Sequence, residues 1–200
     1  MEAIVEKVTQ DVYEALTHDL SNIKLEQERM SENIKGITKE MEKLRENLDD
    51  LEQYGRRESL RFFGVPEKQS EDTDSVIRDV VQQHLNILLN EKNIARSHRI
   101  TPKPGNSSHG RGPKPIIVRF TTYNIRRNVY EAKSKLKGSN IFIHEDLTPF
   151  KRDLINKARK MSSVKRVWSS DGRIIALRSA PDGHEKKVLV RNVSDLALLE

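Results

Sequence analysis

Apolar residues recur through the first fifty positions at alternating spacings of three and four, with charged and polar residues between them. This spacing puts one narrow apolar stripe along a single α-helix. A stripe that persists for several heptads is typical of a coiled coil, and less so of a helix packed on its own domain. The predicted oligomerisation residues, all at a or d positions, are Leu16, Leu20, Ile23, Met30, Ile34, Ile37, Met41, Leu44, Leu48 and Leu51.

The seam also carries information about orientation. Glu40 at a g position faces Arg45 at the following e position of a parallel partner, which is a complementary pair and favours parallel self-association. Gln27 occupies an a position, where a polar residue fixes register at some cost in stability. The mixture of Ile, Leu and Met at a and d leaves dimer and trimer both open.

The pattern changes at residue 57, where short β-branched runs begin to alternate with helical periodicity. We predict strands over 60–65, 94–101, 116–122 and 140–147. One helix, capped by Thr73 or Asp74, should extend to Leu88, and a second should end at Gly138. The run 116–122 should be central in the sheet, and the Pro- and Gly-rich stretch 101–115 should be a loop. The order β-α-β-β-α-β is the split βαβ arrangement that RNA-recognition motifs and many unrelated folds share.

The remaining residues predict a second small unit. Thr148 and Pro149 should open a helix as N-cap and first residue, and Asp171-Gly172 should turn a β-hairpin. A second turn is expected at Asp182-Gly183, before a closing helix capped by Asn192 or Ser194. The fold class is therefore α+β, with three expected parts: a coiled coil over 1–53, an RRM-like domain over 54–146 and a small basic C-terminal domain over 147–200.

Charge separates these parts further. Residues 1–55 carry 7 basic and 14 acidic side chains, whereas residues 56–200 carry 29 basic and 16 acidic ones. Such a basic half indicates a polyanionic partner, most often nucleic acid. The chain has no cysteine, which excludes disulfides, thiolate metal sites and cysteine nucleophiles. We expect a soluble intracellular protein, since no apolar run reaches the length of a membrane span.

Basic side chains concentrate on and beside the predicted sheet and the following helix. Arginine grips phosphates with its planar fork and also stacks on bases. The aromatic positions that RNA-recognition motifs use for base stacking hold Arg61, Pro115 and Ile117 instead. Trp168 is either a half-buried anchor or a stacking residue. The predicted nucleic-acid-binding residues are Arg56, Arg57, Arg61, Arg96, Arg99, Lys114, Arg119, Arg126, Arg127, Lys151, Arg152, Lys157 and Arg159.

Catalysis is disfavoured because the chain has no Walker loop, no GxSxG and no His/carboxylate cluster at metal spacing. The sequence "IHED" at 143–146 is better interpreted as a polar strand end than as a metal site. We therefore expect no enzyme activity, cofactor or metal. The alternative to nucleic-acid binding is a coiled-coil scaffold whose globular half binds a protein partner.

Three separated motifs carry a family resemblance: "YGRRESLRFFGVPE", "SHRITPK…PKPIIVRF" and "IFIHEDLTPFKRDLINKAR". In this order they resemble the first-open-reading-frame protein of LINE-one-type retrotransposons. The resemblance implies a coiled coil that trimerises, a noncanonical RNA-recognition motif and a C-terminal domain. It also implies a nucleic-acid chaperone that coats the element's RNA, binds single-stranded RNA and DNA, and works with the element's reverse transcriptase. The implied location is a ribonucleoprotein particle in the cytoplasm and also the nucleus.

Overall fold

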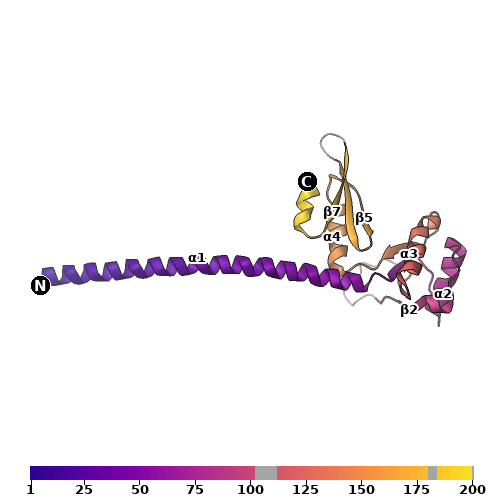
Figure 1. The fold of residues 1–200 in the computed structure, drawn as a ribbon, viewed down its shortest axis with the longest axis horizontal. Coiled ribbons are helices and arrows are strands. Elements are labelled where there is room, and N and C mark those ends of the chain that lie inside the picture. The colour runs from indigo at the N-terminus through magenta and orange to yellow at the C-terminus, as the bar shows by residue number, and fades with distance from the viewer. Residues whose placement is uncertain (102–111, 180–183, 200) are drawn as a thin grey trace. The chain divides into compact units, whose positions relative to one another are not determined.

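The computed structural model describes residues 1–101, 112–179 and 184–199 of the chain (Figure 1). The predicted turn at Asp182-Gly183 and most of the predicted 101–115 loop lie outside these residues. The chain forms two compact units, Met1–Leu48 and Asp49–Glu200. The fold class is α+β, as the sequence predicted, with one long helix followed by two antiparallel sheets and their helices. Among the described residues, no helix combines the length and the hydrophobicity of a membrane span.

Helix α1 runs without a break from Glu2 to Gly55 (Figure 1). Its 54 residues span about 80 Å at 1.5 Å per residue. Every a and d side chain of the predicted oligomerisation set is exposed in the single chain, from 45% for Met41 to 70% for Leu51. A water-exposed apolar stripe of this length is unfavourable on a lone helix, and it indicates self-association through a coiled coil.

The first sheet contains β1 (Ser59–Phe63), β2 (Ile94–Arg99), β3 (Ile116–Phe120) and β4 (Phe142–Glu145). The strands are antiparallel in the order β2-β3-β1-β4. Strand β3 is central, as predicted, and β4 lies at an edge. Helices α2 (Thr73–Val80) and α3 (Tyr123–Glu131) cover one face of the sheet. Leu60 and Phe62 on β1 point to this face and are completely buried, because alternate residues of a strand face opposite sides.

Two details of the first predicted helix were wrong. Its N-cap is Asp72, whose carboxylate accepts hydrogen bonds from the backbone N–H groups of Asp74 and Ser75 at 3.2 and 3.3 Å. Asp72 keeps the extended backbone that an N-cap requires, whereas Thr73 is already helical. The helix also ends earlier than Leu88. A π-helical turn (Val81–Leu85) leads to Asn86 in the left-handed conformation, which stops the helix and leaves Leu88 78% exposed.

The second sheet is an antiparallel meander of β5 (Val164–Ser170), β6 (Arg173–Ser179) and β7 (Glu185–Val190). Asp171 and Gly172 both have positive φ, as the predicted two-residue hairpin turn requires. Helix α4 (Pro149–Arg159) begins as predicted, with the Thr148 hydroxyl accepting from the Lys151 N–H. The apolar face of α4 packs on this sheet around Leu154 and Ala158, and a short 3₁₀ helix (Ser194–Leu199) closes the second core.

Candidate nucleic-acid interface

The two faces of β1 have different chemistry. Leu60 and Phe62 enter the core, so Arg61 and Phe63 point to the face of the sheet that α2 and α3 leave open. Strand pairing extends this open face to both neighbours of β1. Arg61 lies opposite His144 on β4 and opposite Ile117 on β3. Arg119 on β3 is paired with Arg96 on β2, so cations also occupy the far side of the open face.

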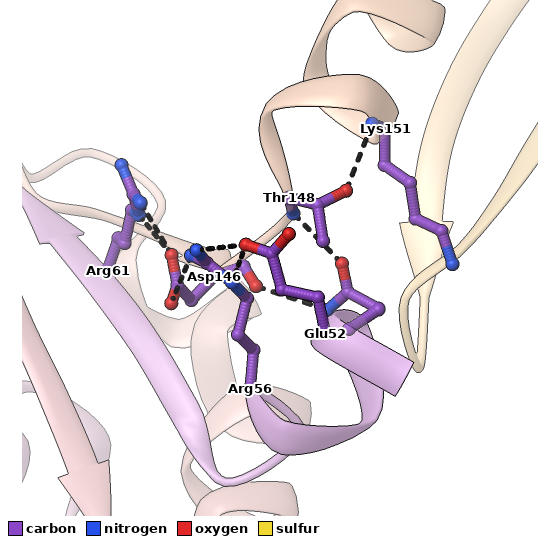
Figure 2. A network of polar contacts seen from close by, with 7 residues as sticks. Glu52, Arg56, Arg61, Asp146, Thr148 and Lys151 are labelled. Atoms are coloured by element: carbon purple, nitrogen blue, oxygen red, sulfur yellow. Dashed lines mark hydrogen bonds and ion pairs between the residues drawn. The ribbon is translucent and has the colours of Figure 1, made fainter. Parts of the chain in front are cut away.

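Asp146 organises the arginines that the sequence places around β1. Figure 2 shows its carboxylate between two guanidinium groups: Arg61 binds one oxygen at 2.6 Å and Arg56 binds the other at 3.0 Å. The side chain of Asp146 is only 3% exposed. A buried carboxylate requires such partners, since an unpaired charge out of water is costly. Arg56 and Arg61 therefore hold the segment between β4 and α4 against β1.

The last turns of α1 complete this network. Gln53 is buried and bridges two backbone groups, donating to the Asp146 carbonyl and accepting from the Thr148 N–H. Lys151 at the start of α4 reaches the Asp50 carboxylate at 2.9 Å. We call these contacts of Gln53, Arg56, Arg61, Asp146 and Lys151 the polar clamp, and Figure 2 shows the part of it around Arg56, Arg61 and Asp146. The clamp fixes how α4 and the second sheet lie against the first sheet within the Asp49–Glu200 unit.

The two sheets and α4 enclose a cleft of about 340 Å³ at the β4 edge. Its basic lining residues come from three parts of the chain: Arg61 on β1, Lys133 after α3, and Arg152 and Arg159 on α4. Its ring-bearing lining residues are Phe63, Tyr130, His144 and Trp168. We call this space the basic cleft. Cations beside flat rings are the combination that binds phosphates and bases of single strands.

The cations of the basic cleft repel one another. Burial, and then the charge of Arg61, lowers the pKa of the Arg152 guanidinium, and the nearby carboxylate of Asp146 offsets only part of this shift. Burial also lowers the pKa of Lys133, and the pKa of His144 falls through burial and the charges of Lys133 and Arg159. No acidic side chain of the described residues forms an ion pair with Arg152 or Arg159, and the lining carboxylate of Glu145 is buried against Arg126. An anion in the cleft would relieve this repulsion.

A second cavity, of about 560 Å³, is lined in part by residues of the polar clamp, such as Gln53 and Arg56. It contains cations such as Arg57 and Arg173, but four carboxylates also line it: Asp50, Glu145, Asp146 and Asp171. These acids already pair with Arg56, Arg126 and Lys151 of the same lining. Because its charges largely cancel, this cavity is a poorer match for a polyanion than the basic cleft is.

Two of the predicted site residues, Arg99 and Arg126, bind other groups of the protein with their guanidinium groups. Arg99 ties down the loop after β1, donating to the Glu71 carboxylate at 2.6 Å and to the backbone carbonyls of Val65, Pro66 and Lys114. Arg126 is 2% exposed and pairs with the buried Glu145, so its guanidinium is not at the surface. Arg99 and Arg126 therefore stabilise the fold, although nothing in the sequence distinguishes them from arginines at the surface.

Lys151 is buried beside Asp50, and Arg56 and Arg61 are bound to Asp146. Six of the remaining predicted cations are accessible outside the basic cleft. Arg57 is exposed and stacks on the Tyr54 ring with its guanidinium 4.0 Å from the ring centroid. Arg119, Arg127 and Lys157 each contact one carboxylate at the surface, at 3.3, 2.7 and 2.8 Å, respectively. Such exposed pairs are weak and exchange readily with phosphate. Arg96 and Lys114 are exposed on the first sheet and just before β3.

Sequence reasoning missed part of this site. Lys133, Tyr130 and His144 join the cleft only because α3 and the β4 edge meet α4 and β5, a contact that no local pattern encodes. Trp168 is half-buried in the cleft wall, with Arg166 5.4 Å from its ring centroid. The alternation of apolar and polar residues along β5 did not predict which face of the strand Trp168 occupies. A bulge shifts the pairing register between Val164 and Arg166. Among the described residues, no His, Asp or Glu cluster could hold a metal ion.

Comparison with known proteins confirms the family resemblance as a distant one. LINE-1 type transposase domain-containing protein 1 of Mus musculus is 27% identical to this chain over 130 residues. The match covers 58% of this chain and 16% of the mouse protein, so the chain spans only a small part of that relative. No protein-family model matches the chain.

Proposed function

We propose that this chain, a distant relative of the LINE-1 type transposase domain proteins, is a non-catalytic, oligomeric protein that binds single-stranded RNA and DNA. The observation that carries the proposal is the basic cleft, where four cations surround a cavity lined by four rings. Guanidinium and ammonium groups contact phosphates without regard to sequence, and flat rings accept any base. A duplex, whose bases are stacked inside, offers its phosphates but no free base face.

Self-association multiplies this binding. The exposed seam of α1 supports a parallel coiled coil, so that several basic clefts are tethered along one strand. Tethering raises effective concentration and increases avidity by roughly 10²–10⁴-fold over a single cleft. The family resemblance implies a trimer, but the heptads of this chain leave dimer and trimer both open. The heptads lack the family's order of Arg at g followed by Glu at e, and their g-to-e pairs run with the opposite sign.

The distant relationship supports a proposal for the biological role. We propose that the oligomer coats retrotransposon RNA in a ribonucleoprotein particle of the cytoplasm and nucleus, and acts as a chaperone beside the element's reverse transcriptase during transposition. Many weak phosphate contacts neutralise the repulsion between strands and exchange quickly. Strands held in this way can test one pairing after another, which is what a chaperone requires.

Charge reversal in the cleft tests the proposal. The double variant Arg152→Glu/Arg159→Glu should bind single-stranded RNA much more weakly for every base composition. The slope of log affinity against log salt should also become shallower by about 0.7 for each phosphate that the protein no longer neutralises. Lys186→Glu/Lys187→Glu is the matched control, because it makes the same charge change at exposed residues of β7 outside the cleft lining. An equal decrease in affinity in both variants would contradict a localised site and favour general charge attraction.

A further inference from the structure

Three ring-bearing side chains gather on the open face of the first sheet, at its β4 edge. Phe63 on β1 and Phe142 on β4 are direct partners across the strand pair. Two residues away along each strand, Arg61 is the partner of His144. Cross-strand partners hold their Cβ atoms about 4.5–5.5 Å apart on one face. These four residues therefore form a two-by-two array of three rings and one guanidinium, which we call the edge array.

The rings of the edge array are accessible and oriented. Phe142 is 58% exposed, an unusual exposure for a phenylalanine on a sheet whose other face is closely packed. The rings of Phe63 and His144 meet edge to face, with centroids 5.4 Å apart and planes at 73°. This contact holds both rings in place without stacking one on the other. An accessible ring beside two fixed ones is a preformed surface for a flat ligand.

The surroundings of the array identify that ligand. Phe63, His144 and Arg61 also line the basic cleft, so the array continues directly into the group of Arg152, Arg159 and Lys133. An apolar protein partner has no need of so many cations at its rim, whereas a nucleotide brings one flat apolar base and one phosphate together. The charge complementarity therefore selects a nucleobase for the rings and its phosphate for the cations.

We infer that the edge array of Phe63, Phe142 and His144 stacks a nucleobase of the bound single strand, whose phosphate lies among the cations of the basic cleft. The inference rests on the proposed function and extends it. RNA-recognition motifs stack bases on the two central strands. Here those positions hold Arg61 and Ile117, and the stacking surface lies instead on β1 and the edge strand β4. The base is held by its face, so the site accepts purines and pyrimidines alike.

A comparison of RNA with an abasic strand separates the contribution of base stacking to affinity from that of the phosphate charges. The 200-residue chain is titrated with a mixed-sequence RNA and with an abasic ribose-phosphate strand of the same length and charge. Phe142→Ala should weaken binding of the base-containing strand by roughly 5- to 150-fold, since base–aromatic stacking has this magnitude. Binding of the abasic strand should change less than about two-fold. Phe142→Trp, which keeps a flat ring, should restore the affinity for RNA.

The controls distinguish a failure of the stacking inference from a failure of the proposed function. Leu88→Ala truncates another exposed apolar side chain of the same unit and should leave binding of both strands unchanged. Truncation at an exposed site should also leave the unfolding temperature near that of the wild type, which a thermal melt checks. Unchanged RNA affinity in Phe142→Ala, or an equal decrease in affinity for both strands, would overturn the inference while leaving the proposed function standing. A wild-type protein that binds neither strand would overturn both.

Discussion

Arg126 and its neighbour Arg127 provide a direct test of the structure, because the sequence assigned both to nucleic-acid binding and the structure separates them. The Arg126 and Glu145 side chains are 3% and 1% exposed, and form a buried ion pair. Arg126→Met leaves the Glu145 carboxylate buried without its cation. Removing one partner of a buried pair costs about 3–5 kcal/mol of the free energy of unfolding.

This destabilisation should be easy to measure. For a unit of this size, each kcal/mol lowers the unfolding temperature by about 2–4 °C, so Arg126→Met should unfold roughly 6–20 °C below the wild type. Trp168 is the single tryptophan and lies in the Asp49–Glu200 unit, so its fluorescence follows the unfolding of that unit independently of the α1 coiled coil. Arg127→Met is the matched control. Its pair with Glu131 is exposed and contributes little to stability, so its unfolding temperature should fall much less than that of Arg126→Met.

A double variant checks that the loss of stability comes from the unpaired carboxylate of Glu145. Arg126→Met/Glu145→Gln removes both buried charges and should recover a large part of the stability. Below its unfolding temperature, Arg126→Met should bind RNA as the wild type does, since its guanidinium is not at the surface. The reasoning would be refuted if Arg126→Met unfolded with the wild type but bound RNA more weakly, because Arg126 would then be a binding residue.

Three further predictions concern other parts of the same unit. Arg99→Ala should lower the urea midpoint, because the Glu71 carboxylate and three carbonyls lose their donor, but should not change the salt dependence of RNA binding. Gln53→Ala should lower the free energy of unfolding by about 1–3 kcal/mol in a urea titration, since the buried groups that it bridges are left without partners. RNA binding should strengthen as the pH falls from about 7.5 to 5.5, because the pKa of His144 is lowered in the free protein and a bound phosphate raises it. His144→Gln should abolish this pH dependence. The folding stability of the free protein should respond to pH in the opposite direction. His144 has a lower pKa in the folded chain than in the unfolded chain, so the unfolded chain binds the proton more readily. The free energy of unfolding should therefore fall as the pH drops below about 6.5.

The elements and their order were predictable because they depend on local patterns. The heptad spacing of α1, the β-branched run of β3 and the Asp171-Gly172 turn each encode their own geometry. The Thr148-Pro149 start of α4 is equally local. Where several residues could serve one role, as Asp72, Thr73 and Asp74 could for the N-cap of α2, the choice depended on backbone conformation and was predicted wrongly.

The role of each arginine was not predictable, because it depends on contacts between residues far apart in the chain. Arg126 meets Glu145 and Arg99 meets Glu71 only after the sheet has formed. In the sequence these residues look like the exposed Arg127 or Arg96. The edge array escaped prediction for the same reason, since Phe63 and Phe142 are adjacent only through the pairing of β1 with β4. The number of basic residues indicated the kind of partner but did not locate its binding site.

The central claim is that this protein binds single strands through charge and base stacking together. A salt titration of the 200-residue chain with a mixed-sequence single-stranded RNA and with a duplex of the same length tests it most directly. We expect single-strand affinity to fall linearly with salt concentration on logarithmic axes. We also expect the single strand to keep its advantage over the duplex at high salt, where screening weakens the phosphate contacts and stacking remains. Equal affinity for both at every salt concentration, or no binding at low salt, would contradict the account and favour a protein-binding scaffold.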